Sequence, residues 1–224
     1  MFTGSLNLYL KGWMEPVIRW LLAIPGGIHF RKLALSWSRQ EDISLTMALM
    51  EGCSHTLESL YISLDLDGTP IWYLCLLSSS FLFAEEPKSA SFSLSDATKL
   101  KDVVFRLGSR RVEWVTLAPQ TVGHEHKDLR RISIDILPDL TLIQAHVYPD
   151  VRQAFGEGVF GQWLDLGRLL VYLWESRSIR PGLIYLWPRP KTGWHVDCIW
   201  SLLPEITKRG IFERVRCHIS FVSR

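Results

Sequence analysis

The amino-acid sequence predicts an α/β leucine-rich-repeat solenoid, a horseshoe arc of about six or seven strand–helix repeats that share one parallel sheet. Three observations support this fold class: a recurring apolar pattern, the near-equal spacing of its copies, and helix-like segments between them. We expect residues 1–224 to form a single domain, with an irregular apolar insert at about 67–92 and an irregular repeat at about 137–180. A compact α/β domain, which also alternates strands and helices, is the alternative.

The apolar pattern occupies positions one, four and six of a hexapeptide, and each copy predicts a strand. Full copies begin at Phe30, Leu57, Leu100, Leu129 and Phe212. Partial copies consist of Leu6, Leu8 and Leu10 and of Leu183, Ile184 and Leu186. Because successive side chains of a strand point to opposite faces of a sheet, we expect the apolar positions to face the core and the residues between them to face outward.

The spacing of the copies is the stronger observation. Phe30 and Leu57 are 27 residues apart, and Leu100 and Leu129 are 29 apart. The 83 residues from Leu129 to Phe212 are close to three further units. The 43 residues from Leu57 to Leu100 depart from this period, and we attribute the excess to the insert. Leucine-rich repeats of up to about 29 residues pair a strand with a helix, which fits this period.

Apolar residues at three- and four-residue steps predict helices between the strands. The four stripes are Val17, Ile18, Leu21 and Leu22; Ile43, Met47, Met50 and Cys53; Leu166, Leu169, Leu170 and Leu173; and Val196, Ile199, Trp200 and Leu203. Gly26 and Gly27 are expected to stop the first helix, whereas Glu41 and Asp42 favour the start of the second through the helix dipole. Pro204 is expected to break or kink the last helix.

Each predicted unit has an apolar flank that it cannot bury alone, so several units must stack for stability. Stacking would bring the outward-facing strand residues together on one concave surface, which is the predicted partner-binding site. Its residues are Lys32, Tyr61, Asp102, Arg106, Arg131, Asp135, Arg214 and Arg216.

The charge of the chain gives no reason to expect nucleic acid or an anionic membrane as a partner, because the net charge is only +2. The basic pairs Arg110-Arg111 and Arg130-Arg131 have acidic residues nearby, which favours a solvated face with local ion pairs. A small basic patch for an acidic protein segment is the alternative. The uncharged segment Thr69–Ala84 has 16 residues, fewer than the roughly 20 of a membrane span, and is interpreted as a buried insert.

The four cysteines are Cys53, Cys75, Cys198 and Cys217, and their spacing matches no zinc site. We interpret them as reduced, buried or half-buried thiols, because cysteine is among the residue types most often buried. Isolated thiols and a start without a secretory leader predict an intracellular protein, cytoplasmic or nuclear.

Two short motifs suggest chemistry, and a structural interpretation is favoured for both. Gly156–Gly161 has the spacing of a dinucleotide-binding loop, but no buried strand leads into it, so we expect a flexible loop between repeats. His124-Glu125-His126 has no third metal ligand nearby and predicts a solvated turn. Because the sequence has no serine-nucleophile elbow, Walker loop, HExxH or kinase motif, we expect no catalytic site, cofactor or metal.

Six strings carry a family resemblance: WLLAIPGGIHFRKL (20–33), EGCSHTLESL (51–60), LSDATKLKDVVFRLGSRRVEWVTLA (94–118), KDLRRISIDI (127–136), WLDLGRLLVYLWESRSIRP (163–181) and LLPEITKRGIFERV (202–215). They resemble the F-box and leucine-rich-repeat-like proteins of basidiomycete fungi, in the repeat region only. The F-box itself, which opens with Leu-Pro and an acidic residue ahead of the repeats, is not found, and Leu203-Pro204-Glu205 lies at the opposite end.

The resemblance implies an arc that recognises protein partners, as the repeat region of an F-box-type ubiquitin-ligase adaptor holds its substrate. Together with the residue patterns, it predicts a non-enzymatic protein–protein recognition module. Two alternatives stay open. One is a small α/β nucleotide-binding enzyme that uses the Gly156–Gly161 loop, and the other is a truncated gene fragment without independent function.

Overall fold

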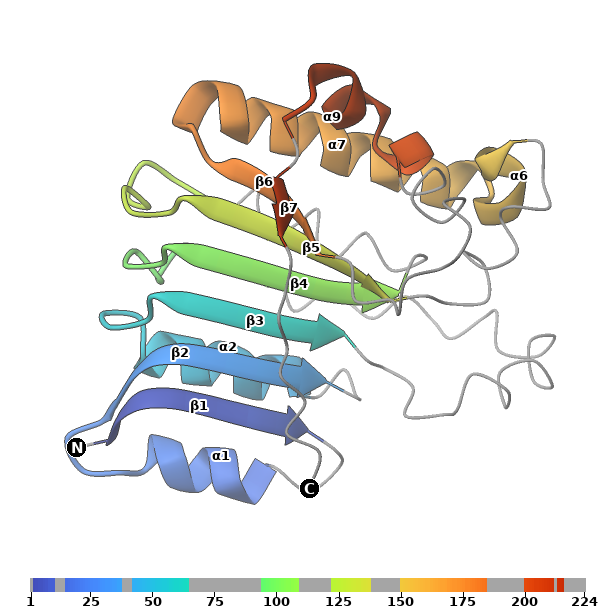
Figure 1. Ribbon diagram of the computed structural model, residues 1–224. Coiled ribbons are helices and arrows are strands. Elements are labelled where there is room, and N and C mark those ends of the chain that lie inside the picture. The colour runs from blue at the N-terminus through green and yellow to red at the C-terminus, as the bar shows by residue number, and fades with distance from the viewer. Residues whose placement is uncertain are drawn as a thin grey trace, which may run out of the picture.

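Seven strands form one parallel sheet in which each strand lies beside its neighbours in the sequence, in the order β1 to β7 (Figure 1). The computed structural model describes residues 2–10, 15–37, 42–64, 94–108, 122–137, 150–184, 200–211 and 213–215. The strands are β1 (Phe2–Leu10), β2 (Ile28–Trp37), β3 (Ser59–Leu64), β4 (Asp102–Gly108), β5 (Arg131–Leu137), β6 (Arg180–Ile184) and β7 (Glu213–Val215). The helices are α1 (Glu15–Leu22), α2 (Asp42–Gly52), α6 (Val151–Phe155), α7 (Glu157–Arg177) and α9 (Pro204–Arg209). The predicted α/β class with a parallel sheet is confirmed.

One face of the sheet is built from the predicted apolar positions, and we call it the leucine face. Two of its rows, read from β2 to β5 through the strand register, are Leu33, Leu60, Val103 and Ile132, and Leu35, Ile62, Phe105 and Ile134. None of these side chains is more than 2% exposed. Such stacking of equivalent positions places an apolar residue of one unit against its counterpart in the next, so neighbouring units share one core.

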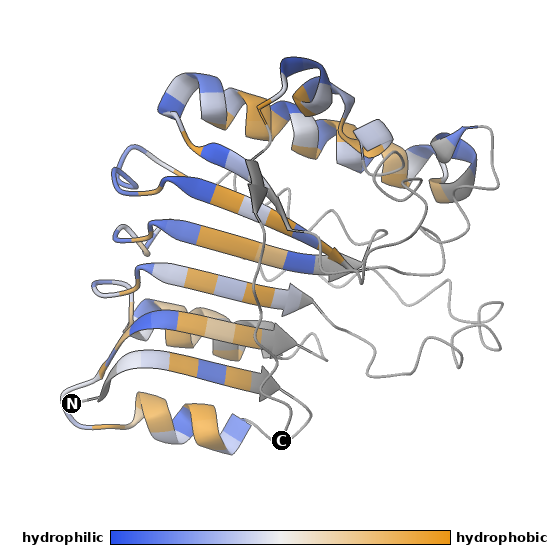
Figure 2. Ribbon diagram, viewed as in Figure 1, coloured by the Kyte–Doolittle hydropathy of each residue, from blue (hydrophilic) through white to orange (hydrophobic). Residues whose placement is uncertain are grey.

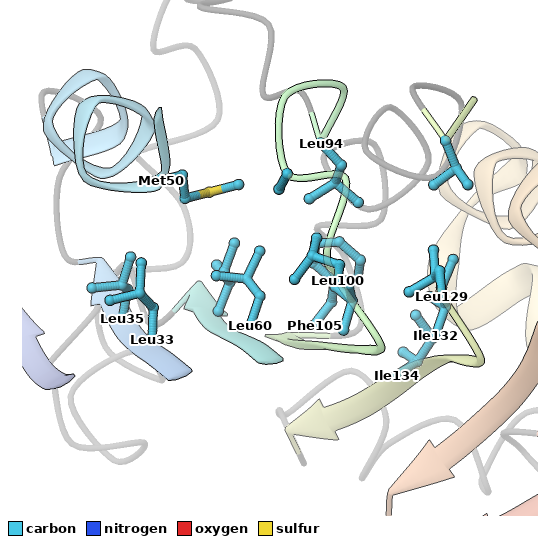
Figure 3. Close-up of a cluster of buried hydrophobic side chains, with 14 of the residues drawn as sticks. Leu33, Leu35, Met50, Leu60, Leu94, Leu100, Phe105, Leu129, Ile132 and Ile134 are labelled. Carbon is cyan, nitrogen blue, oxygen red and sulfur yellow. The ribbon is translucent and has the colours of Figure 1, made fainter. Parts of the chain in front are cut away.

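Helices and turns cover the leucine face. In Figure 3, Met50 of α2 and Leu94, from the turn before β4, lie opposite the strand side chains. The same core cluster includes Ile18 of α1, Trp163 of α7 and Ile206 of α9, all fully buried. Figure 1 shows α1 below β1, and α7 and α9 beyond the opposite end of the β1–β6 stack. The apolar side of the sheet is therefore the packed side of the molecule.

A ladder of backbone hydrogen bonds precedes the strands and aligns their starts. The N–H groups of Glu58, Lys101, Arg130 and Arg180 donate in turn to the carbonyls of Arg31, Glu58, Lys101 and Arg130, each at 2.8 Å. The same bond therefore recurs at β2–β3, β3–β4, β4–β5 and β5–β6, although the connecting segments differ in length. This repetition keeps the strands in the same register, so equivalent residues of neighbouring strands stay in one row.

The helix predictions hold where the structure describes them. Glycines follow α1, and Gly26 and Gly27 have φ of 84° and 75°, in the left-handed region that glycine adopts without strain. Asp42 is the first residue of α2. Pro204 occupies the first turn of α9, where its missing N–H removes no helical hydrogen bond. Within the described residues, no helix is both long enough and apolar enough to cross a membrane.

Three details of the repeat prediction are wrong. The stretch from β5 to β7 holds two units and not three, because Ile132 pairs with Pro181, 49 residues later, and β6 pairs directly with β7. In β7 the register differs by one residue from the predicted hexapeptide. Val215 pairs with Ile184 in the outward row of Asp135, although the pattern placed it toward the core.

The third correction concerns Gly156–Gly161, which was expected to be a loop. Gly156 alone separates α6 from α7, and Gly158 and Gly161 lie within α7. The apolar residues Val159, Phe160 and Trp163 explain the difference, because they continue the apolar stripe of α7 against the core. The predicted insert at 67–92 lies outside the described residues, as do 138–149 of the irregular repeat.

Candidate functional site

The opposite face of the sheet carries the residues that alternate with the leucine positions, and we call it the polar face. Three rows cross it: Lys32, Ser59, Asp102, Arg131 and Arg180; Ala34, Tyr61, Val104, Ser133 and Gly182; and Ser36, Ser63, Arg106 and Asp135. Six of the eight residues predicted to bind a partner lie in these rows. The sheet therefore collects side chains from positions more than one hundred residues apart on one surface.

Within the polar face, the structure brings Tyr61, Arg106 and Asp135 into direct contact across β3, β4 and β5. Arg106 Nη1 donates a hydrogen bond to the Tyr61 hydroxyl at 3.3 Å, and Arg106 Nε lies 3.6 Å from Asp135 Oδ2. The Arg106 side chain is 30% exposed, whereas that of Asp135 is only 1% exposed. Asp135 therefore cannot touch a partner directly in this conformation, and it acts by holding Arg106.

Burial changes the acid strength of Asp135. Loss of solvation raises the pKa of its carboxyl from 3.8 to about 6, against the opposing effects of the Arg106 charge and the nearby Tyr61 hydroxyl. No hydrogen bond of ordinary geometry reaches Oδ1 or Oδ2 from the described residues. The ion pair with Arg106 is consequently the main compensation for burying this carboxylate.

Ion pairs at the starts of the strands fix further charged side chains. Arg131 Nε donates to Asp102 Oδ1 at 3.2 Å, and Lys101 Nζ donates to Glu58 Oε2 at 2.8 Å. The hydrogen bond from Lys101 is the main cause that lowers the pKa of Glu58. All four side chains are between one third and one half exposed, so these pairs contribute little stability and mainly orient the groups.

The remaining predicted binding residues do not share one environment. Lys32 is exposed on the polar face at β2. Arg214 has Leu183 as its register partner, and Leu183 pairs with Ile134. Arg214 therefore stands in a row of the leucine face, which differs from its predicted place. Arg216 lies outside the described residues.

His126 has a structural position that the sequence did not reveal. Its side chain is buried, Nδ1 accepts a hydrogen bond from the Gly123 N–H at 3.0 Å, and Nε2 lies 2.8 Å from the Leu94 carbonyl oxygen. It thus ties the turn before β5 to the turn before β4. The expected solvated turn is correct for His124 and Glu125, which are exposed, and wrong for His126.

Several features of the described residues bear on metal binding and catalysis. They contain no group of three or more His, Cys, Asp or Glu side chains placed to hold a metal ion. Burial raises the pKa of the Cys53 thiol, the reverse of what a reactive thiolate needs. The cavity beside Met47, Met50 and Ala97 measures about 60 Å³, far below the size of an ordinary ligand site. A helix, not a strand, leads into Gly156, so the arrangement of a dinucleotide-binding loop is missing there.

Comparison of the chain with protein-family models, with curated proteins and with solved structures found no match.

Proposed function

We propose that this chain is a leucine-rich-repeat type of solenoid that binds a protein partner on its polar face, without an enzymatic activity of its own. The proposal rests mainly on one observation: the two faces of the sheet differ in packing and in exposure to solvent. The described helices pack into the core of the leucine face, while polar-face residues such as Lys32, Tyr61 and Arg106 keep exposed surface. Figure 2 displays the alternation of hydrophilic and hydrophobic residues along the strands that creates the two faces.

The composition of the polar face suits protein recognition. Tyrosine and arginine are among the residue types most enriched in energetically important interface contacts. Arg106 donates a hydrogen bond to the Tyr61 hydroxyl and forms an ion pair with the buried Asp135, so its position is fixed before a partner binds. Pre-ordered side chains lose less conformational entropy when they bind, which favours affinity. A role as the substrate-holding part of a ubiquitin-ligase adaptor is the specific form of this proposal.

Site-specific photo-cross-linking tests which face binds. A photoreactive amino acid at Ser59 or Val104, both half-buried in polar-face rows, should yield a cross-linked partner in cells that make the protein. The same probe at Asp165 or Glu175, both exposed on α7, is the matched control and should yield none. Mass spectrometry of the adducts then reports whether ubiquitin-ligase subunits are among them.

Cross-links that form only from α7 would show that the polar face is not the binding surface. Cross-links from neither face, with the variants folded, would reject the recognition role. Arg106 is unsuitable for a charge-reversal test, because a glutamate there would face the buried Asp135 carboxylate and destabilise the fold.

A further inference from the structure

Cationic side chains gather where β2 to β6 begin, along one edge of the sheet. Figure 2 shows hydrophilic residues at the starts of β2, β4, β5 and β6. Lys32, Arg131 and Arg180 share the first polar-face row, whereas Arg31, Lys101 and Arg130 precede that row by one residue, at positions that the backbone ladder joins. We call this set the basic edge; it consists of Arg31, Lys32, Lys101, Arg130, Arg131 and Arg180 with the acids Glu58 and Asp102.

The two acids of the basic edge are already engaged. Glu58 is hydrogen-bonded to Lys101, and Asp102 to Arg131. Four further cations, Arg31, Lys32, Arg130 and Arg180, are all exposed and form no ion pair with another described residue. The charges of Arg31 and Lys32 help to lower the pKa of Glu58, whereas Arg130 and Arg180 have no acidic side chain paired with them among the described residues. The other acids nearby, Asp96, Glu125 and Asp128, are exposed in the turns before β4 and β5, and none of them forms an ion pair with these four cations. The edge therefore carries an excess of positive charge in a chain whose net charge is only +2.

The arginines are concentrated at the junction of β5 and β6. Arg131 and Arg180 are register partners, and the Arg180 N–H donates to the Arg130 carbonyl at 2.8 Å. Like charges at paired positions of adjacent strands destabilise a sheet. Among the described residues, Asp102 is the only acid that forms an ion pair with one of these three arginines, namely Arg131. A bound anion here would relieve a repulsion that is built into the register.

We propose that the basic edge binds an acidic peptide segment of the partner protein, with Arg130, Arg131 and Arg180 as its principal anion-binding residues. The inference rests on the proposed function and specifies the chemistry of the partner. Arginine suits this role because its planar fork forms paired hydrogen bonds with a carboxylate. The segment runs across the strand starts, along the row from Lys32 to Arg180.

The strand spacing sets the pattern of acids in that segment. Neighbouring strands lie about 4.8 Å apart, so Lys32 on β2 is roughly 14 Å from Arg131 on β5, and Arg180 is about 5 Å further. Side chains on one face of an extended peptide repeat about every 6.8 Å. Acids at positions i, i+4 and i+6 therefore match the cations on β2, β5 and β6.

Fluorescence anisotropy with two labelled peptides of about eight residues tests the proposal. One peptide carries three acids at i, i+4 and i+6, and the other has the same composition with the three acids adjacent. The full-length wild-type protein should bind the first peptide more tightly, and added salt should weaken this binding. The double variant Arg130→Glu/Arg180→Glu should lose about tenfold or more in affinity.

The matched control is Arg19→Glu/Arg168→Glu, which makes the same charge change at exposed positions of α1 and α7 and should bind like the wild type. If the Glu variant fails to fold, judged by its circular dichroism melt, Arg130→Gln/Arg180→Gln replaces it, and its peptide affinity should also fall.

Absence of peptide binding at low salt, or equal binding by wild type and the double variant, would overturn the proposal. The proposal would also be overturned if a single-stranded oligonucleotide bound more tightly than either peptide and the double variant at Arg130 and Arg180 lost that binding. Cross-linking from Val104, which lies in the next polar-face row, does not depend on these cations, so the inference can fail while the recognition role survives.

Discussion

The two faces of the same strands are buried to different extents and for different reasons. On the leucine face, Leu60 and Ile132 are both fully buried, although they lie on different strands, β3 and β5. On the polar face, burial changes along the sheet: Tyr61 on β3 is half-buried, whereas Ser133, two strands away in the same row, is 1% exposed. Alternation along a strand therefore decides which side a residue faces, and its neighbours decide how deeply it is buried.

The difference matters because the two faces stabilise the protein by different interactions. Apolar burial is nondirectional and scales with area, so every row of the leucine face contributes in the same way. A buried polar group is tolerated only when a partner compensates its lost hydration. Asp135 depends mainly on Arg106 for this compensation, so the polar face is the more sensitive of the two to changes in protonation.

The largest expected effect is on the leucine face. Leu60→Ala should lower the free energy of unfolding by about 2–5 kcal/mol, because it leaves a cavity between two repeat units. Its neighbour Ser59, half-buried on the polar face, provides the control, and Ser59→Ala should change stability by less than about 0.5 kcal/mol. Urea unfolding followed by circular dichroism measures both. Similar losses in the two variants would mean that the two faces are not distinguished by packing.

Replacement of Asp135 by asparagine should alter the pH dependence of stability. Burial raises the folded-state pKa of Asp135 to about 6, above the 3.8 of an unperturbed carboxyl. Its contribution to stability is therefore fully present below about pH 4 and is lost as the pH rises through 6. Asp135→Asn removes this titration, so its stability relative to the wild type should rise by about 2–3 kcal/mol between pH 4 and 7.5. Denaturant unfolding at the two pH values checks this, and a constant difference would contradict it.

The smallest effect is expected at the half-exposed ion pairs of the strand starts. Lys101→Met, which keeps the aliphatic part of the side chain but removes its charge, should cost less than about 1 kcal/mol. Most of the difference from wild type should disappear at 1 M salt, because screening weakens exposed pairs. Thermal melts at low and high ionic strength give the measurement. A larger loss that persists in salt would mean that this pair is coupled to the backbone ladder.

The sequence located most strands and helices because their signals are local. The copies beginning at Phe30, Leu57, Leu100 and Leu129 repeat one pattern, and each leads into a strand with the expected face buried. The pattern failed in β7, where Arg214 pairs with Leu183 in a leucine-face row and Val215 pairs with Ile184 in the outward row. A one-residue shift exchanges the two faces of a strand, and only pairing with β6 selects between them.

The sequence predicted which residues of the candidate site share a face of the sheet, but not which of their side chains are in contact. The positions of Tyr61, Arg106 and Asp135 between apolar neighbours already indicated one shared face. The pairing of Arg106 with Asp135 could not be predicted, because Arg131 and Lys101 were equally available partners in the sequence. The position of Arg180 beside Arg131 was also missed, since Arg180 begins an atypical strand that contains Pro181 and Gly182.

The sequence by itself determined the alternation of apolar and polar residues, and with it most of the strands and helices and, from β2 to β5, the side of the sheet that each residue faces. Those properties depend on the period of the backbone, which is written in a few consecutive residues. Only the tertiary structure decided that two units follow β5, that Arg131 stands beside Arg180, and that Asp135 is buried beneath Arg106. These features depend on which segments become neighbours, and neighbours in the sheet are set by packing across connections of unequal length.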